Sequence, residues 1–223
     1  MRDYKNYHET DLNRKILYDG NLILERALDG FEAYDAILND EKKTKILLLN
    51  KFNMSKEFKT IIGRPEDIKR GNLFKIDNDY WLVVTYPENN KIYKKADAQL
   101  CNGTFTVKME STFDFLRDEN GELKYDRFGN PIPIEIKGEE KEIPCVYENK
   151  YMTTNDNQQL PLPDGRIHVT LPYVKADNIN INKEFYMEGI KYKISDIDYS
   201  KKIGNVGIMT IIADRVVKEN GDV

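Results

Sequence analysis

Residues 73–84 read LFKIDNDYWLVV. Two runs of aliphatic and aromatic residues flank the polar positions 77–79. Such residues fit the pleated surface of a β-sheet, and a short Asn/Asp turn between two such runs is typical of a hairpin. We therefore predict an antiparallel hairpin in which Tyr80 and Trp81 alternate between surface and core. The same two rings admit a second interpretation, a stacking platform for a base or a sugar.

A similar order of elements returns near the C-terminus. At an offset of 111 residues, Phe74 falls on Phe185 and Asn78 falls on Gly189, which suits a turn position where a positive φ is needed. Few of the aligned residues are identical, so the support for a repeat is the shared order of strand, tight turn, aromatic strand, polar turn and strand. Whether the two β-meander units are related stays open at this level.

The N-terminal region has the best helical pattern of the chain. Apolar residues recur at roughly helical spacing from Asp11 to about Leu38, and Asp11 or Thr10 can serve as the N-cap. Gly20 and Gly30 interrupt this pattern, because glycine weakens a helix interior. We therefore expect a broken helical or irregular arm.

These patterns together predict a mainly β fold, with small β-barrel or meander units, an N-terminal arm and long loops. Prolines in the middle of the chain confine several strands to sheet edges or strand ends. The expected divisions are an arm at 1–43, a first β-meander unit at 44–102, a loop-rich β insertion at 103–172, a second β-meander unit at 173–216 and a charged tail at 217–223.

Composition and charge exclude some classes of function. The chain has 223 residues and a formal net charge of −4. A protein whose affinity comes from neutralising phosphates is normally basic, so dedicated nucleic-acid binding is disfavoured. No window approaches about eighteen consecutive apolar residues, which argues against a transmembrane helix. Residues 1–5 lead into polar residues, so we expect no secretory signal and no association with a membrane.

The residues that usually carry metal or thiol chemistry are few. The cysteines are Cys101 and Cys145, the histidines are His8 and His168, and their spacing does not match a zinc site. Without secretion, two buried reduced thiols are favoured, and a disulfide between them stays open. His168 is expected to be a partly exposed residue of a strand.

The motifs in the sequence do not favour catalysis. Residues 118–121 resemble a calcium loop only superficially: with Gly121 at the sixth position, Leu116 and Arg127 occupy the first and twelfth, where Asp and Glu are required. The sequence contains no phosphate-binding glycine loop and no nucleophile elbow. We therefore expect that the protein is not an enzyme, and we predict no catalytic, cofactor-binding or metal-binding residues and no cofactor.

A set of stretches, in order along the chain, carries a resemblance to a known group of proteins: Asp67–Phe74, Tyr80–Val83, Ile92–Ala96, Leu100–Asn102, Ile143–Val146, Leu162–Ile167 and Tyr192–Asp198. Together they resemble virion structural proteins of tailed phages that infect Gram-positive bacteria, which are assigned to the head–tail connector, the neck or the upper tail. The resemblance covers about residues 40–215. That group commonly has a Trp soon after its Cys-Asn pair, whereas here the pair is followed by Phe105.

The resemblance implies a non-enzymatic subunit of the ring at the phage head–tail junction, through which DNA passes. It implies contacts with copies of the same chain, with neighbouring portal, connector or tail proteins, and transiently and non-specifically with the passing DNA. The protein would be part of the virion, assembled in the cytoplasm of the host bacterium. The N-terminal arm and the 103–165 region are the candidates for contacts between subunits.

Two alternatives stand beside this interpretation. The first is a structural subunit of the tail or baseplate, which differs only in its position in the particle. The second is a small β-barrel ligand-binding module for a peptide or single-stranded nucleic acid, in which Trp81 or Tyr80 would contact the ligand. Relatives can also carry an additional immunoglobulin-like domain, which this sequence does not include, and a role in surface display is therefore in doubt.

Overall fold

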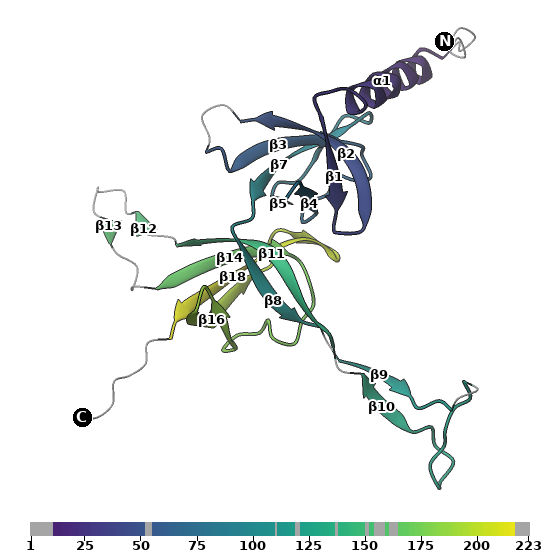
Figure 1. Ribbon diagram of the computed structural model, residues 1–223, viewed down its shortest axis with the longest axis vertical. Helices are drawn as coiled ribbons and strands as arrows, with labels where there is room; N and C mark the ends of the chain where they lie inside the picture. The colour runs from purple at the N-terminus through teal and green to yellow at the C-terminus, as the bar shows by residue number, and fades with distance from the viewer. Residues whose placement is uncertain are drawn as a thin grey trace.

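The computed structural model describes residues 11–51, 55–109, 111–118, 121–136, 138–149, 152–153, 159–160 and 165–216. His8, the alternative cap Thr10 and the expected charged tail at 217–223 lie outside these ranges. Within them, helix α1 (Leu12–Leu28) is followed by strands that form two antiparallel barrels, one beside the other (Figure 1). The predicted mainly β fold of small barrel units is therefore confirmed.

The first barrel is built from a seven-stranded sheet. Its strands are β1 (Ala33–Leu38), β2 (Lys42–Asn50), β3 (Phe58–Gly63), β4 (Leu73–Ile76), β5 (Asp79–Val83), β6 (Glu88–Asn89) and β7 (Lys94–Leu100). They pair in the order β3-β2-β1-β4-β5-β7-β6, and β3 also pairs with β7, which closes six strands into a barrel. Ile46, Phe74 and Trp81 belong to the hydrophobic core of this barrel. The hairpin predicted from residues 73–84 is β4 and β5, with Phe74 opposite Trp81.

The second barrel follows after a link of two residues. Its strands are β8 (Gly103–Lys108), β11 (Glu140–Asn149), β14 (Arg166–Pro172), β15 (Glu184–Met187), β16 (Ile190–Asp198) and β18 (Val206–Arg215), with β17 (Lys202–Ile203) paired to β18. They pair in the order β15-β16-β18-β14-β11-β8, so β15 and β8 are the end strands of a nearly closed barrel. Between these end strands, the ring of Phe185 meets that of Phe105 edge-on, with ring centres 4.9 Å apart.

The two barrels have the same connectivity. Numbered along the chain, the six barrel strands of each lie in the spatial order first, second, third, sixth, fifth and fourth. The 111-residue offset seen in the sequence superimposes β4 on β15 residue for residue. It also matches two pairs of positive φ values, Gly71 at 90° with Asn182 at 70°, and Asp77 at 53° with Glu188 at 49°. Equivalent turns therefore recur in equivalent places.

The segments that the sequence analysis assigned to an arm and to an insertion both contain strands of the barrels. Strand β1 lies within the segment expected to be an irregular arm, yet it pairs with β2 and β4 in the first barrel. Strands β8, β11 and β14 lie within the expected insertion, yet they complete the second barrel with β15, β16 and β18. Strand β11 pairs with β8 through residues 140–145 and with β14 only from Val146 onward. Pro144 therefore has a neighbouring strand on one side only, as is usual for a proline within a sheet.

Helix α1 is continuous through Gly20, in contrast to the predicted break. Asp11 caps it as predicted, because its carboxylate accepts a hydrogen bond from the backbone N–H of Asn13 at 2.9 Å. A side chain at position 20 would overlap the side chain of Ile92, which packs against the helix at this point. The glycine thus permits a close contact between the helix and the first barrel. None of the described helical residues forms a segment long and apolar enough to cross a membrane.

A hairpin arm projects away from the second barrel (Figure 1). Strands β9 (Thr112–Phe115) and β10 (Pro133–Ile136) form its own two-stranded sheet, and residues 116–118 and 121–132 belong to the tip. Another small hairpin consists of β12 (Met152–Thr153) and β13 (Gln159–Leu160). We call residues 112–136 the arm below.

A buried carboxylate ties the loop between β3 and β4 to strand β2. Asp67 is 2% exposed, and its carboxylate accepts hydrogen bonds from the Thr44 hydroxyl at 2.7 Å and from the Lys42 ammonium. Its backbone carbonyl accepts a hydrogen bond from the Asn72 side chain at 2.7 Å. Burying a charge is unfavourable unless it is paired in this way, so the arrangement holds the loop in one position.

The variant Asp67→Ala would remove the shared acceptor of Thr44 and Lys42. We expect the free energy of unfolding to fall by about 1–3 kcal/mol, because the buried Thr44 hydroxyl loses its acceptor, whereas the Lys42 side chain is 55% exposed and remains hydrated. Asp79→Ala, at an exposed position of β5, is the control, with an expected change below about 0.5 kcal/mol. Urea unfolding followed by Trp81 fluorescence measures both, and equal losses would contradict this role.

Candidate functional site

The two aromatic residues considered as a stacking platform have different surroundings. Trp81 is 5% exposed and belongs to the core of the first barrel, with the Lys59 ammonium 5.0 Å from its ring centre. Tyr80 is partly exposed, and its hydroxyl donates a hydrogen bond to Asp40 at 2.9 Å. The predicted alternation of core and surface is therefore confirmed, and Trp81 has no open face on which a base could stack.

The two cysteines are free thiols and lie where the first barrel joins the second. Cys101 belongs to the link between β7 and β8, and the buried Cys145 is on β11. Burial raises the pKa of each thiol to about 12. Both sulfurs therefore stay protonated at neutral pH, and a protonated thiol is a poor nucleophile and metal ligand.

The other residues considered for metal binding or catalysis do not form a common site in the described part of the chain. His168 is a partly buried residue of β14, as expected from its alternating position. Asp118 lies in a turn, where its carboxylate accepts a hydrogen bond from the Glu122 backbone N–H at 2.9 Å. In the part of the chain that the structure describes, no three His, Cys, Asp or Glu side chains come together to hold a metal ion.

The barrels share a hydrophobic core across the seam between them. Leu73 and Leu82 are residues of the first barrel, yet they pack in the core cluster of the second. The linking residue Asn102 adds directed contacts, because its backbone N–H donates to the Cys145 carbonyl at 3.1 Å. Its side chain also donates to the Tyr147 carbonyl at 2.9 Å and accepts from the Tyr147 N–H at 2.8 Å.

Two glycines lie where the backbones of the two barrels approach each other closely. Gly71 has a φ of +90°, and a Cβ at this position would overlap the backbone carbonyl of Gly207 in the second barrel. Gly71 also donates its backbone N–H to Val83 at 2.8 Å, which holds the turn in place. A residue with a side chain would have to push the barrels apart here.

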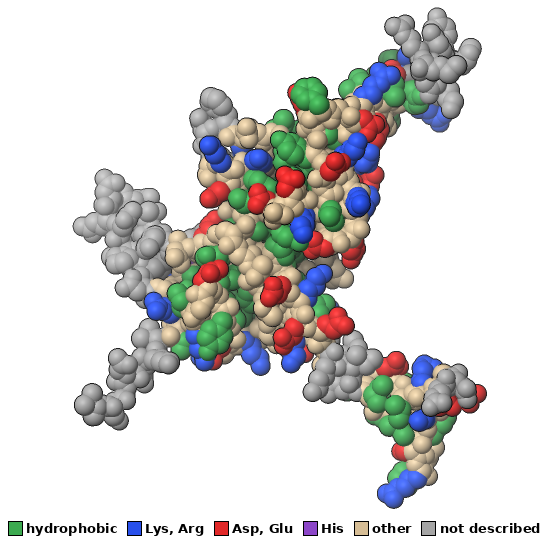
Figure 2. Space-filling model, in the orientation of Figure 1, with side chains coloured by type: hydrophobic (Ala, Val, Ile, Leu, Met, Phe, Trp, Pro, Cys, Tyr) green, Lys and Arg blue, Asp and Glu red, His purple; other side chains and the backbone are tan. Residues whose placement is uncertain are grey.

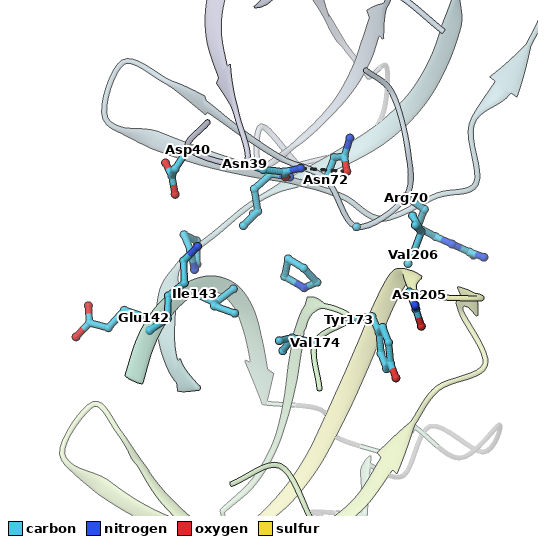
Figure 3. Close-up of a pocket in the computed structure, with 16 residues that line it drawn as sticks. Asn39, Asp40, Arg70, Asn72, Glu142, Ile143, Tyr173, Val174, Asn205 and Val206 are labelled. Atoms are coloured by element: carbon cyan, nitrogen blue, oxygen red, sulfur yellow. Dashed lines mark hydrogen bonds between the residues drawn. The ribbon is translucent and has the colours of Figure 1, made fainter. Parts of the chain in front are cut away.

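The seam leaves a cleft of about 270 Å³ between the barrels (Figure 3). Asn39, Arg70 and Asn72 line it from the first barrel, and residues such as Glu142 and Tyr173 line it from the second. In Figure 3, the charged ends of Arg70 and Glu142 point away from each other and from the centre of the cleft. The cleft therefore presents backbone, amide and apolar groups to a ligand rather than converging charges.

Helix α1 is attached to the first barrel by its C-terminal half. Leu24 and Leu28 are its buried residues. Glu25 accepts two hydrogen bonds from Arg64 of the β3–β4 loop, at 2.9 Å and 2.6 Å, and these bonds lower the pKa of the Glu25 carboxyl. The N-terminal half of the helix extends beyond the barrel (Figure 1).

An exposed apolar stripe begins in this projecting half and continues to Ile23 in the attached half. Leu12, Ile16 and Ile23 are 69%, 54% and 67% exposed, and their spacings of four and seven residues place them on one side of the helix. We call these three residues the helix face. Isolated exposed leucines are common in proteins, but an aligned set on a projecting helix is typical of a contact surface.

The arm carries a second exposed apolar set. Phe113, Phe115, Tyr125 and Phe128 are 77%, 46%, 58% and 73% exposed. Phe113 and Phe115 are two residues apart on β9 and therefore lie on the same side of the hairpin. We call these four residues the arm aromatics. Figure 2 shows hydrophobic side chains on both the arm and α1, and Figure 1 places these two elements at opposite ends of the long axis.

The arm tip is held by its own backbone hydrogen bonds. Lys124 donates to Leu116, Ile132 donates to Lys124, and Leu116 donates to Ile132, at 2.8, 3.0 and 2.9 Å. Two similar turns follow one another, with Gly121 at a φ of 85° and Gly129 at 82°. The arm therefore presents its aromatic residues on an ordered support.

The sequence analysis pointed to the regions that contain the helix face and the arm aromatics, but it did not predict that these side chains are exposed. It named the N-terminal arm and the 103–165 region as contact candidates, and the helix face and the arm aromatics lie in them. A helical period of apolar residues normally indicates a face buried against the same chain. Only the position of α1 relative to the first barrel shows that part of its apolar surface is uncovered.

The fold and its projections define a class, a tandem β-barrel protein with a projecting helix and a projecting hairpin. The YomX N-terminal domain model matches residues 6–99, and the YomX C-terminal domain model matches residues 130–214. The chain is also 34% identical over 220 residues to a protein named "SPbeta prophage-derived uncharacterized protein YomX" from Bacillus subtilis (strain 168). This match covers 98% of the chain and 99% of that protein.

The chain therefore belongs to the YomX family. The prophage source of this relative supports the phage origin implied by the sequence resemblance. No solved structure matches the chain.

The raised pKa of the two thiols predicts low reactivity in the folded protein. With a pKa of about 12, about one thiol in ten thousand is ionised at pH 8, whereas unfolding returns both to the ordinary range near 8.5. We expect alkylation by iodoacetamide at pH 8 to be at least about a hundredfold slower in buffer than in denaturant. Mass spectrometry of Cys101 and Cys145 measures this, and comparable rates would show that the thiols are accessible.

The contact between Gly71 and Gly207 predicts that an alanine at position 71 destabilises the protein more than an alanine at position 189. Gly71→Ala and Gly189→Ala both place alanine at a positive φ, but only Gly71 faces a backbone, while Gly189 has open space around it. We expect Gly71→Ala to lower the free energy of unfolding by about 2 kcal/mol more than Gly189→Ala, because overpacking a rigid contact is costly. Parallel urea unfolding curves measure the free energy of unfolding of both variants. Similar losses of stability would show that the contact between Gly71 and Gly207 does not cause the effect.

Proposed function

We propose that the protein is a non-enzymatic structural subunit of a phage virion, located in the ring at the head–tail junction through which DNA passes. The observation that carries this proposal is the pair of apolar contact surfaces, the helix face and the arm aromatics, on elements that project from opposite ends of the molecule. A protein that acts alone gains nothing from exposing such residues, whereas a subunit of an assembly buries them against neighbours.

The barrels suit the body of such a subunit. Each has a closed or nearly closed sheet, so few strand edges remain to pair with other chains in an uncontrolled way. Contacts between subunits then fall to the projections, which can reach neighbouring copies. Heterologous contacts between identical chains generate a ring when the rotation closes.

The charge is compatible with a passage for DNA. The net charge of −4 disfavours tight binding to phosphates, and a channel that held DNA tightly would hinder its exit. In this proposal the contact with DNA is transient and independent of base sequence. The other partners are further copies of the chain and the adjoining portal, connector or tail proteins, and the protein joins the virion in the host cytoplasm.

The sequence resemblance and the prophage-derived relative support a role in the particle. The same observations fit a tail or baseplate subunit, which has the same class of contacts at another position. The alternative of a β-barrel ligand-binding module has less support, because Trp81 is buried in the first barrel. The position of the protein in the particle separates the two structural interpretations.

Labelling of intact particles tests the proposal. An affinity tag after residue 216, decorated with gold, should mark the head–tail junction of purified phage in negative-stain images. Loss of the gene should then yield separate heads and tails, because the junction is incomplete. A label confined to the distal tail would move the protein to the tail or baseplate. Absence of the protein from particles would overturn the structural proposal.

A further inference from the structure

Beside the cleft of Figure 3 lies a second pocket, with a volume of about 370 Å³. The two share Arg70 and Val206 in their walls. The side chain of Arg70 points out of the cleft (Figure 3), and its charge is therefore available to the second pocket. Lys69 and Lys94 line this pocket as well, and we call it the basic pocket. Its volume is in the usual range for sites that hold small ligands.

The three cations of the basic pocket are not neutralised by the protein. In the part of the chain that the structure describes, no carboxylate forms an ion pair with Lys69, Arg70 or Lys94, and no Asp or Glu lines the pocket. Glu88 on β6 is bound instead to Lys95, at 2.9 Å. Five other cations of the first barrel or its loops contact a carboxylate: Lys42, Lys45, Lys51, Arg64 and Lys95. The positive charge of the pocket therefore favours an anionic ligand.

The cations are held in place before a ligand arrives. Lys69 and Arg70 follow the buried Asp67, whose hydrogen bonds fix the β3–β4 loop. Lys94 is the first residue of β7 and pairs with Gly63 of β3. Charged groups on ordered supports lose less conformational entropy when they bind a ligand. The basic pocket is thus a formed site of the folded chain.

Much of the remaining wall is apolar and comes from both barrels. Tyr86, between β5 and β6, is 67% exposed, and the Arg70 guanidinium lies 5.8 Å from its ring centre. Ile203 on β17 and Val206 on β18 line the pocket from the second barrel and are also exposed. Exposed aromatic rings beside cations are the combination with which proteins stack bases while they bind phosphates. The pocket therefore suits a ligand that has an anionic part and a flat apolar part.

A phosphate group fits these cations better than a carboxylate does. Its oxygens can accept hydrogen bonds from several cations at once, and the planar fork of an arginine matches phosphate geometry. The aromatic wall adds a further distinction, because a nucleotide carries a flat base next to its phosphate. An acidic side chain of a peptide has no ring attached to its anionic group. The chemistry of the pocket thus favours a nucleotide over an acidic peptide.

We propose that the basic pocket binds a nucleotide, with the phosphate on Lys69, Arg70 and Lys94 and the base on Tyr86. Free nucleotides and single nucleic-acid strands present the same group, and competition experiments distinguish them. The inference goes beyond the proposed function and does not depend on it. Binding is weak and depends on salt, because three cations attract the phosphate to a chain with a net charge of −4.

Fluorescence anisotropy at low salt tests the pocket, with a labelled oligothymidylate of about ten nucleotides as the probe. Lys69→Ala/Arg70→Ala should weaken binding at least about tenfold, because it removes two charged hydrogen-bond donors. Tyr86→Ala should weaken binding at least about fivefold, because the base loses the ring on which it stacks. Absence of binding to the wild-type protein at millimolar protein concentration would overturn the proposal.

The matched control removes the same charge outside the pocket. Lys43 on β2 and Lys193 on β16 are exposed, and Lys43→Ala/Lys193→Ala should change binding less than about twofold. Tyr186→Ala, at a residue of β15 that is 71% exposed, is the control for Tyr86→Ala. Equal losses in the pocket and control variants would overturn the pocket, because binding would then follow net charge alone. Thermal unfolding establishes that all variants are folded.

Competition separates the two sources of the nucleotide. If thymidine monophosphate displaces the labelled strand at a concentration at which inorganic phosphate does not, the pocket takes the free nucleotide. If only an unlabelled strand displaces the probe, the pocket takes nucleotide units of a chain. Equal displacement by inorganic phosphate or by polyglutamate at the same ionic strength would overturn the proposal, because the pocket would then hold any anion. Neither result depends on whether the protein is found in particles, so the virion role is tested separately.

Discussion

The close approach of the two barrels at Gly71 and Gly207 determines the shape of the molecule. Burial of Leu73 and Leu82 in the second core provides an attraction between the barrels, but apolar burial has no preferred direction. Direction comes from the glycine contact and from the hydrogen bonds of Asn102, which leave few ways to place one barrel on the other. Because α1 is attached to the first barrel and the arm to the second, the seam also sets how far apart these two projections lie.

The structure separates residues that stabilise the fold from residues that remain available for contacts. Leu24, Leu28 and the pair of Glu25 with Arg64 hold one half of α1 on the first barrel, and the other half keeps its apolar residues in solvent. The arm follows the same principle, since backbone hydrogen bonds order its tip while its aromatic side chains are exposed. Exposed apolar groups of this kind add little to folding but reduce the entropy lost on association, because their supports are already ordered.

The parts of the structure that sequence reasoning predicted depend on local patterns. The hairpin at 73–84, the burial of Trp81 and the cap at Asp11 follow from alternation, turn chemistry and hydrogen-bonding capacity within a few residues. The misjudged parts depend on distant partners. Gly20 weakens an isolated helix, yet it permits the contact with Ile92 some seventy positions later in the chain. Strand β1 was not foreseen in the barrel, because its pairing with β4 joins segments that are separated in the sequence by strands β2 and β3.

The amino-acid sequence by itself determined the mainly β class and the position of the main turns, since both depend on residue type and short-range order. The equivalent turns at Asp77 and Glu188 show that such local rules act in the same way in both halves of the chain. Only the tertiary structure decided that strands β1, β8, β11 and β14 belong to the barrels, that two barrels share one seam, and that the helix face and the arm aromatics are left uncovered. The physical reason is that strand pairing and burial are properties of surfaces brought together from distant positions, and these are set by the packing of the whole chain.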